Sequence, residues 1–220
     1  DRDRIRIRKS GRHYVKLSDR WANRMLGARD SGTDVRELEL VPGGTFESRT
    51  TIGSYGASKP LRGLQSTVET PPLHLRHYRG RIAYVSNALT YTENEILPDS
   101  FRHHLAANLS NPRFVDVDTN FARIEQRLTP STVLPGSYYQ LDSENSGHFG
   151  HLMTEVISRL WGWDRAKQDD PDLKALFRIR YPNERDPKLE RLVFTAFGIA
   201  PEDITWVDQP VYLESMYAAT

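Results

Sequence analysis

Cysteine is absent from this 220-residue chain, which excludes a disulfide framework, a thiolate zinc site and a cysteine nucleophile. The sequence also has no apolar run of membrane-spanning length and no hydrophobic segment of the secretory type. Charge is nearly balanced, since 30 lysines and arginines face 29 aspartates and glutamates, so no overall field attracts nucleic acid or anionic lipid. We therefore expect a cytoplasmic protein that does not bind nucleic acid and that reaches a membrane only through a partner.

Several catalytic signatures are missing as well. The chain has no Gly-x-Gly-x-x-Gly fingerprint, no phosphate-binding P-loop and no Gly-x-Ser-x-Gly elbow, so none of the activities tied to those motifs is indicated. Asp116-Val117-Asp118 has the spelling of a metal or diphosphate motif, but such a short pattern is frequent in surface turns. We expect neither a metal ion nor another cofactor.

Residues 1–137 are interpreted as a strand-rich N-terminal region. Alternating and β-branched runs favour strands, and stretches rich in glycine, serine and threonine favour loops. On these grounds we expect strands at 4–8, 13–17 and 34–41, a long loop over 43–70, a hairpin turning at Arg79-Gly80, and helices over 100–109 and 121–128.

From residue 138 onward strands and helices alternate. We expect strands at 138–141, 175–181, 204–207 and 211–217, and helices at 148–161 and 187–198, with Gly198 ending the second helix. This order predicts an α/β fold with a Rossmann-like parallel sheet over residues 138–220. Because no helix follows the last strand to cover the sheet, we expect the chain to be part of a larger protein.

The most informative segment runs from Ser143 to Trp163. It follows a strand, passes through a polar glycine turn and opens a helix whose apolar residues recur at the helical period: Phe149, Leu152, Met153, Val156, Ile157, Leu160 and Trp161. A second, polar stripe is spaced by three, four and four residues: His148, His151, Glu155 and Arg159. An α/β protein places its site at such a strand-to-helix turn.

The polar stripe offers acid–base chemistry. His151 and Glu155 are four residues apart on one helix face, so the carboxylate can orient the imidazole. The helix dipole disfavours a charged histidine near the N-terminus, which leaves a neutral imidazole able to act as a base. The alternative is that both side chains only bind neighbouring loops. The spacing matches no common zinc motif.

The turn before the helix is a second candidate. Asn145-Ser146-Gly147 precedes backbone N–H groups that no helical carbonyl accepts, and such groups bind anions or sugar phosphates. We therefore expect Asn145, Gly147 and His148 to contact substrate.

Residues Gly147 to Trp161 resemble the signature of glycosyltransferase family 61, which includes bacterial enzymes labelled capsular polysaccharide biosynthesis proteins. The matching positions are Phe149, His151, Leu152, Glu155, Arg159 and Leu160. The chain differs from the family at two places. Leu152 stands where the family has an aromatic residue after its histidine, and Ile157-Ser158 stands where the family has Leu-Pro before its Arg-Leu pair. The resemblance covers roughly residues 138–220.

The resemblance implies a GT-B-type enzyme that moves a sugar from a nucleotide-sugar donor to a hydroxyl of a glycan or polysaccharide acceptor, with inversion. In that scheme His151 is the base or positions the acceptor, Glu155 is its partner or the base itself, and Arg159 assists by charge or by holding Glu155. The chain would cover the first half of such an enzyme, completed by a C-terminal domain or by a second copy. Two other functions stay open: a non-catalytic carbohydrate- or protein-binding domain of the same fold, and a hydrolase using His151 and Glu155.

Overall fold

The computed structural model describes residues 13–17, 34–47, 67–92, 95–101, 111–117, 121–124, 129–179 and 187–220. Within these ranges eleven strands form one sheet in the order β12-β11-β10-β13-β5-β6-β7-β1-β9-β8, and β2 also pairs with β5. The strands of this sheet are β1 (His13–Leu17), β2 (Asp34–Val41), β5 (Leu73–Tyr84), β6 (Thr90–Tyr91), β7 (Glu95–Ile96), β8 (Phe114–Val117), β9 (Phe121–Ile124), β10 (Thr132–Gln140), β11 (Lys174–Arg178), β12 (Ile204–Val207) and β13 (Val211–Ala219).

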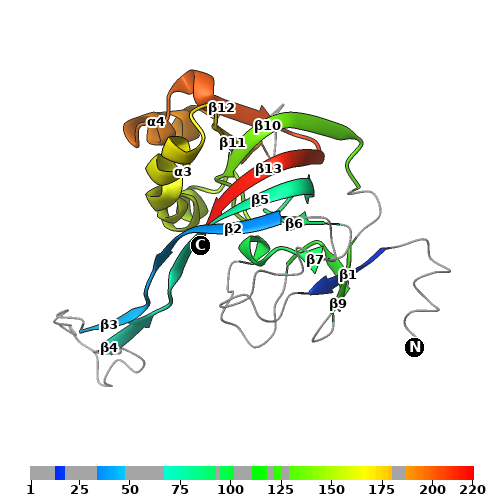
Figure 1. Cartoon of the computed structure of the whole chain (residues 1–220), viewed down its shortest axis with the longest axis horizontal. Coiled ribbons are helices and arrows are strands. Elements are labelled where there is room, and N and C mark those ends of the chain that lie inside the picture. Colours follow the sequence, from blue (N-terminus) through cyan, green and yellow to red (C-terminus); the bar gives the residue numbers. More distant parts are fainter. Residues whose placement is uncertain are drawn as a thin grey trace, which may run out of the picture.

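Helical segments lie mainly in the second half of the described chain. They are the turn η1 (Pro98–Ser100), the consecutive α2 (Phe149–His151), η3 (Leu152–Val156), η4 (Ile157–Gly162) and α3 (Trp163–Asp169), then α4 (Lys188–Ala196) and the turn η5 (Pro201–Asp203). In Figure 1 α3 and α4 lie together at one side of the sheet, beside β10 to β13.

The predicted α/β arrangement is present in residues 132–220. β10 pairs in parallel with both β11 and β13, and β11 pairs in parallel with β12. The sheet as a whole is mixed, because β13 also pairs antiparallel with β5, from Val211 opposite Tyr84 to Ala219 opposite Leu75. The predicted strand-rich region and the predicted α/β region are thus hydrogen-bonded into one sheet.

The predicted hairpin at Arg79-Gly80 is wrong, because β5 runs unbroken through these residues. Gly80 has a φ of 127°, and the register with β13 shifts between Leu213 and Ser215 at this level. The glycine therefore accommodates a β-bulge, which is the other common use of glycine inside a strand. The chain turns instead after β5, where Asn87 and Ala88 both have positive φ.

Two other predictions for the N-terminal region are corrected. The expected loop over 43–70 contains at its two ends the strands β3 (Gly44–Glu47) and β4 (Thr67–Thr70), which pair antiparallel as a separate ribbon that projects from the sheet in Figure 1. The expected helix over 121–128 begins as strand β9, paired with β1 and β8. Ala122 and Ile124 are buried in the core of this part of the sheet, a tertiary effect that outweighs local propensity. The strand predicted at 4–8 and the helix at 102–109 lie outside the described residues.

Alternating side chains of the sheet build two cores, one on each face. Tyr139, Phe177 and Tyr217 point to the face covered by the helices, together with Leu152, Val156 and Leu160. Tyr78, Tyr138 and Met216 belong to the opposite face. The described strands therefore carry large buried side chains on both sides.

The segment Phe149–Asp169 continues eight residues beyond the predicted end at Trp161. Leu152, Val156 and Leu160 are buried as expected, but Phe149 is 61% and Met153 46% exposed. In the wide π turn η3 the Ile157 N–H donates to the Leu152 carbonyl, so the number of residues per turn differs from that of an α-helix. The apolar residues predicted to share one face of a regular α-helix are therefore split between buried and exposed positions. The prediction for Gly198 is confirmed: its φ is 84°, and the Ile199 N–H donates to the Phe194 carbonyl at 3.0 Å.

Candidate functional site

A cavity of about 250 Å³ lies beside the carboxyl end of β13. One wall is helical and carries Thr154, Glu155, Ser158 and Arg159. The turn η1 contributes Ser100 and Phe101, β13 ends in the cavity with Ala219 and Thr220, and Leu73, Ala88 and Glu144 complete the lining. Open α/β sheets place ligands at the carboxyl ends of their strands, so this is the candidate site.

The helical wall contains Glu155 and Arg159, two of the three residues that the sequence indicated as catalytic. The third, His151, is hydrogen-bonded to Glu155. His151 Nδ1 lies 2.5 Å from Glu155 Oε1, so an ionised Glu155 accepts the Nδ1 proton and leaves Nε2 as an acceptor. The rings of His148 and His151 meet edge to face, with centroids 5.0 Å apart. The polar stripe is thus a continuous face, but only Glu155 and Arg159 reach the cavity.

The winding of the helix changes at these residues. Glu155 lies within the π turn η3, and Arg159 lies in the tighter η4 that follows. Both departures from α-helical winding are frequent at functional positions. No pattern in the sequence predicted them.

Arg159 is fixed at two points. Its Nη2 donates to the Asp99 carbonyl at 3.2 Å, and its own carbonyl accepts the Tyr139 hydroxyl at 2.5 Å. Its Nη1 is buried and has no hydrogen-bond partner among the described residues. A buried guanidinium N–H without an acceptor is costly, so Nη1 is the Arg159 nitrogen whose hydrogen-bonding capacity is unused among the described residues.

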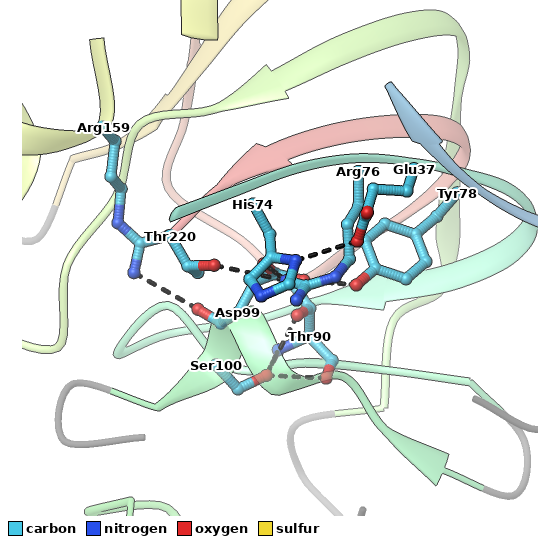
Figure 2. A network of polar contacts seen from close by, with 9 residues as sticks. All are labelled: Glu37, His74, Arg76, Tyr78, Thr90, Asp99, Ser100, Arg159 and Thr220. Atoms are coloured by element: carbon cyan, nitrogen blue, oxygen red, sulfur yellow. Dashed lines mark hydrogen bonds and ion pairs between the residues drawn. The ribbon is translucent and has the colours of Figure 1, made fainter. Parts of the chain in front are cut away.

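Asp99 anchors the opposite wall. Its carboxylate is fully buried and accepts Arg76 Nη1 at 3.2 Å and the Tyr78 hydroxyl at 2.5 Å (Figure 2). Arg76 Nη1 also donates to Thr220 Oγ1 at 3.2 Å. Burial, with the charge of Asp99, raises the pKa of Tyr78 well above its ordinary value. The network thus fixes both η1 and the end of β13, where they line the cavity.

Ser100 secures the same turn from its other side. Its hydroxyl donates to the Thr90 carbonyl at 2.8 Å and accepts the Thr90 N–H at 2.9 Å. The wall that faces Arg159 is therefore held by side chains in a buried setting, not by its three-residue turn alone.

The loop between β10 and the helix is organised by Asp142, which is fully buried. Its carboxylate accepts the Tyr84 hydroxyl at 2.9 Å, the Ser143 N–H at 2.9 Å and the Ser146 hydroxyl. Burial raises the pKa of Asp142 to about 6, although these three bonds act in the opposite direction. The loop then turns at Gly147, whose φ is 81°.

The predicted substrate-binding residues of this loop lie outside the cavity lining. The Asn145 carbonyl accepts the His148 N–H at 3.2 Å, Gly147 forms the turn, and the exposed His148 precedes the helix without capping it through its side chain. Glu144, next to Asn145, is the loop residue that reaches the cavity.

A separate polar cluster lies on β5, β13 and the end of α3. His77 stacks on Tyr217 with ring centroids 3.9 Å apart, and its Nε2 lies 2.8 Å from Ser215 Oγ. The Tyr217 hydroxyl donates to Asp169, which also pairs with Arg36. Burial and the charges of Arg79 and Arg36 lower the pKa of His77 to about 4, so this histidine is neutral at pH 7 and structural.

Sequence reasoning missed Asp99, Arg76, Thr220, Asp142 and Glu144. Asp142 could have been found, because an acidic residue directly after a buried strand marks the edge where α/β sites form. The others gave no local signal. Among the described residues no group of three or more His, Asp or Glu side chains could hold a metal ion, and Asp118, His103 and His104 lie outside them.

In the described part of the chain no helix combines the length and the apolarity needed to cross a membrane. No family model, curated protein or solved structure matches this sequence.

Proposed function

We propose that this chain is the acceptor-side half of a GT-B-type glycosyltransferase, which moves a sugar from a nucleotide-sugar donor to a hydroxyl of a glycan or polysaccharide acceptor. The observation that carries the proposal is that Glu155 lines a cavity at the strand ends while it is hydrogen-bonded to His151. The parallel unit β10 to β12, with its intervening helices, is compatible with a Rossmann-like half of this kind. The signature around His151, Glu155 and Arg159 supports the family.

In this proposal Glu155 is the base. It faces the cavity, whereas His151 lies behind it and orients its carboxylate through the 2.5 Å contact. Glu155 takes the proton of the acceptor hydroxyl, the acceptor oxygen bonds to the anomeric carbon, and the bond from that carbon to the diphosphate breaks. The diphosphate leaves with the electron pair, and the anomeric configuration inverts.

In this proposal Arg159 acts on the acceptor through its charge. Its Nη2 is held by the Asp99 carbonyl, and its Nη1 is a buried donor without a partner among the described residues. A donor fixed before the ligand arrives loses little entropy on binding. Arg159 therefore positions the acceptor so that its hydroxyl meets Glu155.

The test is nucleotide release coupled to product mass. The protein is incubated with UDP-, GDP- and CMP-sugars and with oligosaccharide acceptors, and free nucleotide is quantified by chromatography. We expect Glu155→Gln to lower turnover by roughly 10²- to 10⁴-fold and His151→Asn to lower it less, both with unchanged thermal unfolding. The exposed Glu202→Gln is the matched control and should retain full turnover.

Two results would contradict the proposal. If Glu155→Gln released nucleotide and formed product at the wild-type rate, Glu155 would not be the base. If the wild-type protein formed no product with any donor yet still bound a glycan, the alternative of a non-catalytic carbohydrate-binding domain would replace the enzyme.

A further inference from the structure

We infer that the cavity is built to bind one sugar ring through its hydroxyl groups and that it rejects the diphosphate of a nucleotide. That this ring belongs to the sugar acceptor rests on the proposed function. The binding preference itself follows only from which lining groups donate and which accept hydrogen bonds. The described lining of the cavity combines groups that can only accept with groups that can donate.

Most of the acceptors come from the helical wall. The Thr154 hydroxyl donates its one proton to the Gly150 carbonyl, and the Ser158 hydroxyl donates its proton to the Glu155 carbonyl, each at 2.8 Å. Both oxygens therefore offer only lone pairs to a ligand. The ionised carboxylates of Glu155 and Glu144 are acceptors too. A ligand group against these oxygens must carry hydrogen atoms to donate.

The donors are Arg159, on the same helical wall, and Thr220, at the end of β13. Arg159 Nη1 is buried without a partner among the described residues, and guanidinium nitrogen accepts nothing. Thr220 Oγ1 accepts a bond from Arg76, which leaves its own proton for a ligand. A ligand group placed between Arg159 and Thr220 must therefore offer lone pairs.

A sugar hydroxyl satisfies both kinds of group, because it donates and accepts at once. A phosphate ionised at neutral pH presents only acceptors, so it could satisfy Arg159 but would set its lone pairs against those of Thr154, Ser158 and Glu155. Size agrees with this distinction: ligand pockets for drug-sized molecules span roughly 300–1,000 Å³, whereas this cavity of about 250 Å³ has room for a single ring. Phe101 and Ala88 in the lining can cover its C–H face.

The experiment is saturation-transfer NMR on the whole protein with four probes, the methyl glycosides of glucose, galactose, mannose and N-acetylglucosamine, and with pyrophosphate and UDP as competitors. Thr154→Val removes one acceptor at nearly constant shape, and Arg159→Lys removes the Nη1 donor. The control is Thr195→Val, at an exposed position of α4. Circular dichroism and thermal unfolding establish that each variant is folded.

We expect at least one glycoside to bind saturably, with affinity reduced at least tenfold by Arg159→Lys and several-fold by Thr154→Val, but not by Thr195→Val. Pyrophosphate and UDP should not displace it. Displacement by either competitor, failure of all four glycosides to bind, or wild-type affinity in both cavity variants would each overturn the inference.

This test separates the inference from the proposed function. Glycoside binding of the expected kind without sugar transfer would defeat the transferase and leave the cavity assignment intact. Sugar transfer that is unaffected by Thr154→Val and Arg159→Lys would do the reverse.

Discussion

At Gly162 the helical segment before β11 packs tightly against the sheet, which gives a sharp test of the packing. A Cβ atom at this position would lie 2.8 Å from the Tyr139 hydroxyl, 2.9 Å from Leu75 Cδ1 and 3.2 Å from Ala219 Cβ. All three neighbours are buried, so none can move into solvent. Gly162→Ala must therefore push the helix outward or displace the Tyr139 ring.

The magnitude follows from three contributions. Overpacking of a buried site costs about 1–3 kcal/mol, and loss of the bond from the Tyr139 hydroxyl to the Arg159 carbonyl adds about 1 kcal/mol. The better helix propensity of alanine returns roughly 0.5–1 kcal/mol. We expect the free energy of unfolding to fall by about 2 kcal/mol in urea titrations, and the melting temperature to fall by roughly 4–8 °C for a chain of this size.

Gly150→Ala is the matched control, because it changes another helical glycine near the same site. Its Cβ would meet only the His148 ring, at 3.5 Å, an ordinary van der Waals distance, so this variant should be neutral or slightly more stable. If Gly162→Ala were as stable as Gly150→Ala, the close approach of helix and sheet that shapes the cavity would be incorrect.

Two further predictions concern buried carboxylates. Because the pKa of Asp142 rises from its ordinary value of 3.8 to about 6 on folding, the native state retains this proton longer than the unfolded chain does, so stability falls as pH rises from about 4 to 6 and then levels off. A shift of about two pKa units corresponds to ~3 kcal/mol. In unfolding titrations at a series of pH values, Asp142→Asn should remove this fall in stability, and the exposed Asp172→Asn should keep it. An unchanged pH dependence in Asp142→Asn would refute the raised pKa of Asp142. Asp99→Asn removes the buried carboxylate that pairs with Arg76, so the free energy of unfolding should fall by roughly 3–5 kcal/mol, while the exposed Asp164→Asn should change it little. Equal stability of these two variants would contradict the network in Figure 2.

Local patterns predicted elements in both halves of the fold. β2 and β12 have the predicted bounds, and the C-terminal end of α4 was predicted from Gly198. These elements have strong local signals, an alternating strand or a glycine stop. The hairpin at Gly80 failed because glycine marks a bulge as readily as a turn, and only the pairing of β5 with β13 distinguishes the two.

Part of the candidate site could also be predicted from a local pattern. His151, Glu155 and Arg159 share one face because three- and four-residue spacings follow from helix geometry. The assignment of Asn145, Gly147 and His148 to substrate remains a prediction, and the structure places them outside the cavity lining. Sequence spacing indicates which side chains share a face, but not which strand ends enclose a space beside that face.

The cavity exists because of how β13 is placed in the sheet. β13 runs parallel to β10 on one side and antiparallel to β5 on the other, so its carboxyl end meets the amino end of β5, where His74 and Thr220 exchange two backbone hydrogen bonds of 2.9 Å. That junction sets Arg76 beside Thr220, and Arg76 in turn holds Asp99. The residues that the motif supplies, Glu155 and Arg159, thus face a wall built from residues 73–101. The region that the sequence left without a function is therefore half of the candidate site.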